Sequence, residues 1–513
     1  MIEKEERKLE AGLFLRAKKF FEEKTKTDSG KYFFPKNFFS FVSDAFFSGA
    51  AFLLEKMTGK RIYIPDDDEL LPGISEKNKK IIVNFLKKGV LKKVIKAERI
   101  YCDEPKIIQY KCETSDPLFF SDGAMSLTMS AGTDIEEERA LMKAVGEGLE
   151  RFCLCVYRES NLLLSNFKKI SKRAVNPLYF SGLSPIQREK GGSLNIGEKS
   201  IFRWTLANSI FEKEKKYIPA QLIYVGYKYA FGEPIIRQQI STGSALSSSL
   251  EGALYGGICE AVERDSFIIN YLNKLSPPIL DLREINDEDI NYLLRQFKRY
   301  NLEIFLLDIT TDIKIPSIMS IIIDRTGIGQ AVIVTTKTDF SLKKAIVGAI
   351  FEGLQVRLNF REVLNSFDVK IKLESLKKDY TKINTFNNRC LLWSPLEMID
   401  EIKFFLSGEK KIVKKDEFEK NLNNDDKKNL IMASNILKEN HIDVFWADIT
   451  IPQVREEGLW AIKAVSPQLQ PLYLDEGMKH CWGERLFNVP AKIGQKNNPT
   501  KPGELNLIPH PFL

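Results

Sequence analysis

The sequence lacks the short motifs by which several large enzyme classes are recognised. It contains no G-x-x-x-x-G-K-[ST] phosphate loop, no glycine-rich kinase loop and no H-E-x-x-H, which excludes P-loop enzymes, protein kinases and the common zinc proteases. Its seven cysteines are scattered without a C-x-x-C pair, so a structural zinc site is not expected. An odd, scattered set of cysteines in a long chain favours a reducing compartment.

Long apolar runs and a strong charge imbalance are missing as well. The longest apolar stretches, such as Phe46–Leu54, are far shorter than the roughly 20 residues of a membrane span. The opening segment Met1–Lys8 is charged, unlike a signal peptide. The net charge of +7 is small for 513 residues, and no arginine-rich stripe or finger motif points to nucleic acid. We therefore expect a cytoplasmic protein with no membrane span and no nucleic-acid partner.

The composition that remains is typical of globular proteins, with 43% hydrophobic and 28% charged residues. Residues 1–115 are rich in Lys and Phe and predict a small, mainly helical, winged-helix-like domain for docking or packing. Within it, 74–94 predicts a helix, a turn at Gly89 and a strand. Residues 116–513 alternate strands with long helices, which predicts an α+β domain of mixed sheets with a Pro-spaced tail over 499–513.

The spacing of apolar residues predicts the main elements of this second domain. Long helices are expected over 135–157, 249–272 and 341–363. Strands are expected over 303–308, 315–324 and 443–446, and within 217–229. The lysine- and asparagine-rich stretch 408–440 predicts an exposed helical layer.

Two of the long helices carry the same pattern, E-x-x-E-R, in an otherwise apolar sequence. Acids three residues apart lie on one helix face, where like charges repel. Helices that are apolar over most of their surface are buried, and buried carboxylates are costly unless cations or metals pair with them. Mg²⁺ is the natural candidate because it takes oxygen ligands and bridges carboxylates to phosphates. The six residues are Glu147, Glu150 and Arg151 in the first helix, and Glu260, Glu263 and Arg264 in the second.

The third long helix adds Glu352, Gln355, Arg357 and Arg361 with similar spacing. Any one such group is more simply interpreted as a salt bridge on a solvated helix face. Three groups on three largely apolar helices favour a shared site for cations and phosphate. The repeat of E-x-x-E-R leaves open an old duplication or two amphipathic helices with a common pattern.

Loops of small residues, Ser130–Asp134 and Ser241–Ser249, precede the first two acid pairs. Free N–H groups at helix N-termini suit phosphate binding. Plain turns and helix caps use the same residues, so either loop alone predicts little.

Three segments, taken in order, resemble the signature motifs of the YcaO family. They are Ser130–Arg151; Ser241–Asp265, which ends in E-x-x-E-R-D; and Ala345–Arg361, which carries E-x-x-Q-x-R. The resemblance covers roughly 120–513. It implies a YcaO-type catalytic domain that binds ATP and Mg²⁺ without a P-loop.

The resemblance also implies roles for individual residues. Metal ligation falls to Glu147, Glu150, Glu260 and Glu263, and nucleotide binding to Arg151, Arg264, Gln355, Arg357, Glu352, Ser241 and Ser248. The chain departs from many relatives at Gly132–Asp134, where they have Lys, and at Ser248, where they have Asn.

The segments Asp448–Thr450 and Ala464–Leu472 and the Pro-rich end are similar to azoline-forming members of the family. This similarity implies ATP-dependent cyclodehydration of Cys, Ser or Thr in a ribosomal precursor peptide to thiazoline or (methyl)oxazoline, through phosphorylation of the backbone amide oxygen. We expect the carboxylate of Leu513, or His510, to act in catalysis, by proton transfer or positioning; a loose tail is the plainer alternative. Thioamide or amidine formation and a non-catalytic, peptide-presenting scaffold are the alternative functions.

The N-terminal region shows no E1-like signature. We therefore expect a separate leader-binding protein, E1-like or similar, to act with the chain on its precursor peptide. A flavin dehydrogenase acting downstream and a homodimer are left open.

Overall fold

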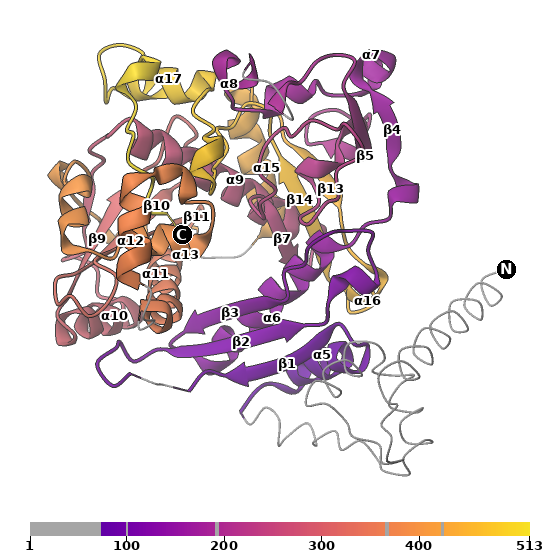
Figure 1. The fold of residues 1–513 in the computed structure, drawn as a ribbon. Helices are drawn as coiled ribbons and strands as arrows, with labels where there is room; N and C mark the ends of the chain where they lie inside the picture. The colour runs from indigo at the N-terminus through magenta and orange to yellow at the C-terminus, as the bar shows by residue number, and fades with distance from the viewer. Residues whose placement is uncertain (1–72, 99–100, 190–193, 365–368, 422–424, 513) are drawn as a thin grey trace, which may run out of the picture. The chain divides into compact units, whose positions relative to one another are not determined.

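The computed structural model describes residues 73–513 except 99–100, 190–193, 365–368, 422–424 and 513. The chain divides into two compact units, Met1–Tyr63 and Ile64–Leu513, and all elements below belong to the second. Three sheets and several long helices make a mixed α+β fold, as predicted (Figure 1). Most of the expected N-terminal domain lies outside the described residues, so the division at residue 115 stays a prediction.

The first sheet has three antiparallel strands in the order β1-β2-β3. Helix α5 leads through Gly89, at φ +67°, into β1, as the sequence predicts for this segment. Helix α6 packs on β2 and β3, and Gly132 makes that approach possible because a Cβ there would lie 2.2 Å from the Ala140 carbonyl oxygen. The bounds are α5 (Glu76–Lys87), β1 (Leu91–Lys96), β2 (Ile108–Thr114), β3 (Met129–Asp134) and α6 (Glu137–Cys155).

The second sheet has the order β11-β10-β9-β8-β12, with only β12 parallel to its neighbour. All eight residues of β10 are buried, because one face packs against α10 and α11 and the other against α9 and α13. The strands are β8 (Ile279–Asp281), β9 (Leu302–Asp308), β10 (Ser317–Asp324), β11 (Val332–Thr338) and β12 (Lys410–Ile412). The helices are α9 (Leu250–Leu272), α10 (Glu288–Arg299), α11 (Leu342–Leu364) and α13 (Phe386–Leu392).

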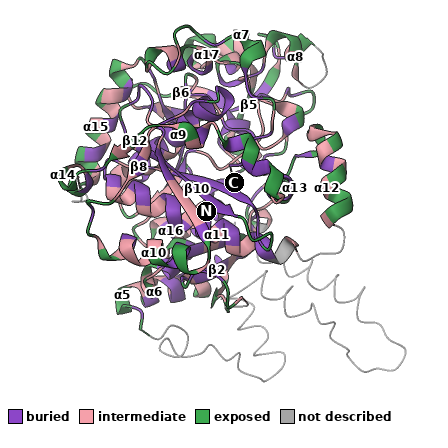
Figure 2. Cartoon of the chain, turned by 90° about the vertical axis from the view of Figure 1, so that its left-hand side faces the viewer, coloured by how far each residue is buried: buried purple, intermediate pink, exposed green. Residues whose placement is uncertain are grey.

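The third sheet runs β4-β5-β13-β14-β7, with β6 paired to β5. Helix α9 lies on β7 and β14 and also contacts β11, so it joins the second and third sheets. This central position explains why α9 is buried along most of its length (Figure 2). The strands are β4 (Leu163–Asn166), β5 (Ile201–Ser209), β6 (Lys216–Pro219), β7 (Ser244–Ser247), β13 (Phe445–Asp448) and β14 (Trp460–Val465).

Two predictions of secondary structure are wrong in part. The segment 217–229 contributes only β6, because Pro219 has no N–H for the ladder and a 3-10 turn over Ala220–Leu222 follows. The stretch 408–440 is not wholly helical, since β12 within it pairs with β8. The remaining helices are α7 (Phe167–Ile170), α8 (Pro185–Glu189), α12 (Val369–Lys378), α14 (Lys415–Glu419), α15 (Asp426–Glu439), α16 (Pro452–Arg455) and α17 (Glu484–Lys492).

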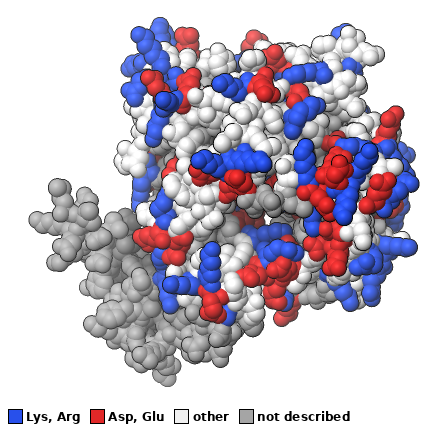
Figure 3. All heavy atoms as spheres, turned by 180° about the vertical axis from the view of Figure 1, so that it is seen from behind, with Lys and Arg blue, Asp and Glu red and all other residues white. Residues whose placement is uncertain are grey.

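The surface carries charges of both signs. Lys and Arg lie beside Asp and Glu over the face shown in Figure 3, with uncharged areas between them. Within the described residues, no helix has the combination of length and apolar character needed to cross a membrane.

Candidate metal and nucleotide site

Helix α6 presents the first acid pair between two sheets. Glu147 Oε1 lies 2.6 Å from Arg151 Nη2, and its Oε2 accepts a hydrogen bond of 3.1 Å from the Ala131 N–H on β3. Glu150 accepts a hydrogen bond of 2.5 Å from the Ser244 hydroxyl on β7. Burial, with a smaller contribution from neighbouring acids, raises the pKa of Glu150 to about 7.

Helix α9 presents the second pair, which is held more tightly. Glu263 accepts hydrogen bonds of 2.9 Å from the Thr336 hydroxyl and from the Thr338 N–H, both on β11. Arg264 forms ion pairs with Glu263 and, at 3.3 Å, with Glu260. Burial raises the pKa of Glu263 to about 7 although Arg264 opposes the shift.

Helix α11 brings the third group to the same region. Glu352 lies 3.4 Å from Lys337 Nζ, and this carboxylate is the chief cause of the raised pKa of Lys337. Gln355 Oε1 accepts a hydrogen bond of 3.1 Å from the Thr133 hydroxyl on β3. The segment Ser130–Asp134, expected as a loop, is thus part of β3, and the third motif adjoins this strand ahead of the first acid pair.

The acids of the three helices interact electrostatically. Burial raises the pKa of Glu147, and Glu352 and Glu260 add to that effect. The carboxylates of Glu147, Glu150, Glu260, Glu263 and Glu352 outnumber the nearby cations Arg151, Arg264 and Lys337. This excess of partly buried negative charge fits a divalent cation with a preference for carboxylate oxygens.

The arginines already engage part of these oxygens. In the part of the chain that the structure describes, no group of three or more His, Cys, Asp or Glu side chains converges closely enough to hold a metal ion alone. Phosphate oxygens would complete the coordination of Mg²⁺, which typically uses few protein carboxylates.

Arg357 lies in a different environment from the one its motif implies. Its guanidinium is buried and donates to Glu104 at 2.6 Å and to Asp324 at 2.8 Å. Arg361 pairs with the same Glu104 and, at 2.8 Å, with Asp103. Both arginines thus tie α11 to the β1–β2 connection, and Arg357 ties it to β10 as well. The nucleotide contact of Arg357 stays a prediction.

The two predicted serines flank β7, which occupies the middle of the segment 241–249 that is expected to be a loop. The Ser241 carbonyl accepts hydrogen bonds from the N–H and hydroxyl of Ser244, at 2.9 and 2.7 Å. Ser248 is exposed and precedes Ser249, whose hydroxyl caps α9 through the Gly252 N–H at 3.0 Å. Their contacts with a nucleotide stay predictions.

The C-terminal segment reaches the second acid pair. The Phe512 ring centroid lies 4.3 Å from Arg264 Cζ, and Phe512 forms a parallel bridge with Val334 on β11. His510 is fully buried, and its Nε2 lies 2.6 Å from the Tyr473 carbonyl oxygen. Burial lowers the pKa of His510 well below its usual range, so its imidazole is neutral here. The prediction for Leu513 lies outside the described residues.

Sequence reasoning missed Lys463, which stands on β14 beside this site. Its Nζ donates to the carbonyl oxygens of Ile240 and Thr242, at 2.7 and 2.6 Å, and burial lowers its pKa to about 7. These bonds hold the turn whose Gly243 N–H donates to Glu260 at 3.2 Å. A single lysine in the apolar run Trp460–Val465 is the signal that could have found it.

The aspartate of E-x-x-E-R-D serves a separate, structural ion-pair network. Arg485 of α17 donates to Asp265 at 2.9 and 2.7 Å and to Asp312 at 3.1 and 2.8 Å. Asp265 is fully buried, and Asp312 has its pKa lowered to about 2, mainly through Arg485 and Lys492 against the effect of burial. The motif thus holds α9 to α17 as well as carrying acids.

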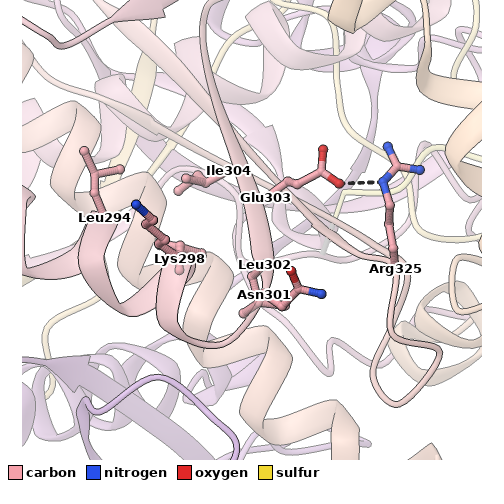
Figure 4. A pocket seen from close by; sticks show the side chains of 8 residues that line it. Leu294, Lys298, Asn301, Leu302, Glu303, Ile304 and Arg325 are labelled. Atoms are coloured by element: carbon pink, nitrogen blue, oxygen red, sulfur yellow. Dashed lines mark hydrogen bonds and ion pairs between the residues drawn. The ribbon is translucent and has the colours of Figure 1, made fainter.

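A surface pocket at the end of α10 lies apart from these residues. Figure 4 shows Glu303 and Arg325 pointing toward each other, with Leu294 and Lys298 on the opposite side of the pocket. Arg325 Nε lies 2.5 Å from Glu303 Oε1. None of the predicted site residues lines it.

Comparisons with known proteins give the family of the chain. Residues 131–470 match the family model described as YcaO cyclodehydratase, ATP- and Mg²⁺-binding. The chain belongs to the YcaO family. ATP and Mg²⁺ are accordingly its cofactors, and it is an ATP-dependent enzyme by family.

Solved structures share the fold. The chain resembles a heterocyclase in complex with substrate and cofactor, with a TM-score of 0.68 and 18% identity over 90% of this chain and 60% of that one. It also resembles YcaO from Methanopyrus kandleri bound with AMPPCP and Mg²⁺, with a TM-score of 0.54 and 13% identity over 79% and 94% of the two chains. The chain therefore spans only 60% of the length of the first of these proteins.

The relatives found by sequence are themselves uncharacterized proteins. An uncharacterized protein of Methanothermobacter thermautotrophicus is 21% identical over 69% of this chain and 84% of its own length. An uncharacterized protein in the tfuA 3′ region of Rhizobium leguminosarum bv. trifolii is 29% identical over 25% and 30% of the two chains.

Proposed function

We propose that the chain converts Cys, Ser or Thr of a ribosomal precursor peptide into thiazoline or (methyl)oxazoline rings, using ATP. One observation carries the choice of this reaction within the family. The C-terminal segment, which resembles azoline-forming members, is packed into the protein and ends on Arg264 beside Glu260 and Glu263. A loose tail would have no such contact.

In the proposed reaction the side-chain sulfur or oxygen of the substrate attacks the preceding carbonyl carbon. The carbonyl oxygen then takes a phosphoryl group and leaves as phosphate while the C=N bond of the ring forms. ATP supplies that phosphoryl group, so the oxygen of the lost water ends in phosphate and ADP is released. Phosphorylation is needed because an amide oxygen that carries no phosphoryl group is a very poor leaving group.

The residues of the chain would neutralise and orient charge. We assign Glu147, Glu150, Glu260 and Glu263 to Mg²⁺, with Glu352 and Gln355 beside them. Arg151 and Arg264 lie on these carboxylates, where a guanidinium can turn to a phosphate oxygen and stabilise charge on the transferred group. The carboxylate of Leu513 follows directly after Phe512 in sequence and is assigned to proton transfer or positioning.

The test is mass spectrometry of candidate peptides rich in Cys, Ser and Thr. The full chain, Mg²⁺, ATP and a leader-binding partner should remove one water for each ring formed. Glu263→Gln and a reaction without ATP are the controls and should leave the peptide mass unchanged. Exchange of oxygen for sulfur would instead identify a thioamide-forming enzyme, and an unchanged mass with the complete system would favour a scaffold.

A separate leader-binding protein is part of the proposal, whereas a flavin dehydrogenase acting downstream stays open. The purified chain alone should therefore process peptides poorly. Efficient ring formation by the chain alone would contradict this part.

A further inference from the structure

The backbone of residues 506–512, here called the C-terminal segment, is held by side chains from two distant helices and their ends. The Tyr271 hydroxyl donates to the carbonyl oxygens of Ile508 and Pro509, at 3.1 and 3.2 Å. Trp393 Nε1 donates to the Pro509 carbonyl oxygen at 3.0 Å. Figure 1 places the end of the chain beside α13 and β11. Every acceptor in this set is a main-chain carbonyl oxygen. These bonds therefore fix the backbone conformation of the segment and do not depend on its side chains.

Arg389 of α13 is the charged member of this set. Its Nη1 donates to the His510 carbonyl oxygen at 2.8 Å, and its Nη2 donates to the Leu474 carbonyl oxygen at 2.8 Å. The side chain is fully buried, and Nη2 also lies 2.8 Å from Oε1 of the equally buried Glu476. Lys479 lies 2.9 Å from the other oxygen of Glu476.

A buried ion pair is a costly way to hold a peptide carbonyl. Apolar residues of similar volume often stabilise a fold as well or better. The forked guanidinium offers instead a fixed geometry, in which two donors define two carbonyl positions at once. Arg389 therefore fixes the backbone at Leu474 and the C-terminal segment relative to each other.

The position of His510 determines where the chain end meets the acid site. Phe512 follows two residues later and packs on Phe267 at 4.8 Å between ring centroids and on Arg264. Arg264 in turn pairs with both acids of α9. The contacts thus run without a break from Arg389 to the carboxylates.

We propose that Arg389, held by Glu476, is a positioning residue that sets Phe512 against Arg264 for the reaction. The inference rests on the proposed function in so far as it concerns catalysis. A displacement of about 1 Å at a reacting centre costs about 100-fold in rate, so loss of this anchor should be severe.

The first experiment measures position without any activity. The full-length protein is treated with a carboxypeptidase, and release of Phe512 is followed by mass spectrometry. Phe512 is only 2% exposed, so the wild type should resist release. Arg389→Met should lose Phe512 at least about ten times faster, and Arg389→Lys, which keeps the charge but not the fork, should fall between them.

Arg203→Met is the matched control, because Arg203 also bonds a carbonyl, that of Lys228, and a carboxylate, that of Glu159, but remote from the segment. It should leave release of Phe512 unchanged. If Arg389→Met does not fold, Tyr271→Phe removes only one hydroxyl from the same set and should still accelerate release.

The second experiment is a double-mutant cycle with a chain that ends at Ile508. In the full-length chain, Arg389→Met should lower kcat for ring formation about 100-fold and leave KM for ATP nearly unchanged. In the truncated chain the same substitution should have no further effect. Losses that multiply, or unchanged release of Phe512 from both Arg389→Met and Tyr271→Phe, would overturn the proposal. Failure to form rings with any peptide would sink the proposed function, yet leave the release experiment intact.

Discussion

The two E-x-x-E-R blocks have the same sequence pattern but different structural environments. On α9, the Glu263 side chain is 2% exposed, takes hydrogen bonds from two groups of β11 and pairs with Arg264, whose guanidinium packs on the Phe512 ring. On α6, the side chains of Glu147 and Arg151 are each 31% exposed; they pair with each other and also bond the Ala131 N–H and the Met129 carbonyl oxygen of β3. The α9 block is therefore the more enclosed of the two, and we expect Glu147 and Arg151 of the α6 block to rearrange more readily when ligands bind.

The residue after each arginine extends the difference. Asp265 follows Arg264 and is locked by Arg485, whereas Phe152 follows Arg151 and lies in an apolar core. The same local pattern therefore occurs on α9, which lies between the second and third sheets, and on α6, which packs on the first sheet. Five experiments would break or sharpen this contrast.

The largest effect is expected from Glu263→Gln. The amide keeps the shape but removes a charge from the fixed side of the site, and ring formation should fall by about 1,000-fold. Glu147→Gln, on the adjustable side, should cost clearly less. Both are measured as kcat/KM with Mg²⁺ and ATP, with Glu251→Gln in the first turn of α9 as the control; equal losses at the two positions would remove the contrast.

Next in size is the stability effect of Arg485→Met. The substitution leaves Asp265 and Asp312 without their guanidinium in the interior and should lower the free energy of unfolding by about 3–5 kcal/mol. Urea unfolding followed by circular dichroism measures it. A loss below about 1 kcal/mol would show that α9 is not held through its aspartate.

A smaller effect concerns pH. Glu150 and Glu263 each have a pKa near 7, above the 4.5 of a free glutamate, because they are buried. Between these values the folded chain binds more protons than the unfolded one, so its stability without Mg²⁺ should fall as pH rises from 4.5 to about 7.

Metal binding should report the same protons. Mg²⁺ takes ionised carboxylates, so binding of Mg²⁺ with ATP at pH 6 should release protons and weaken as the pH falls. Calorimetry in buffers of different ionisation enthalpy counts them. Glu150→Gln and Glu263→Gln should each reduce the count, and no proton release from the wild type would contradict the assignment.

The smallest effect is the stability change of Arg151→Met. The ion pair with Glu147 is partly exposed and should contribute less than about 1 kcal/mol to the free energy of unfolding. Activity should fall all the same, since Arg151 is assigned to phosphate. An unfolding free energy lowered as much as in Arg485→Met would mean that the α6 block is as fixed as the α9 block.

Much of this account could be predicted from local sequence. The three long helices were found within a few residues of α6, α9 and α11, because their apolar spacing is regular over many turns. The acid pairs were found because carboxylates on apolar helices are unusual. The segment after Pro219 was misassigned as strands, since a run of apolar and aromatic residues does not distinguish a strand from a buried irregular segment.

Contacts between distant parts of the chain could not be predicted. The residues next to Arg357 in the sequence do not predict its ion pair with Glu104. Those next to Arg264 do not predict its contact with Phe512. Lys463 was missed because its partners are main-chain carbonyls of a turn more than two hundred residues earlier. These contacts depend on how α9 joins the second and third sheets. That arrangement cannot be predicted from any single motif.

The central claim is that acids from α6 and α9 bind Mg²⁺ and ATP together. Isothermal titration of Mg²⁺ with a non-hydrolysable ATP analogue tests it most directly, on the wild type, Glu150→Gln, Glu260→Gln and the control Glu251→Gln. Loss of affinity in Glu150→Gln and in Glu260→Gln, with the control unchanged, is the predicted result. Wild-type affinity in either of the two variants would contradict the claim.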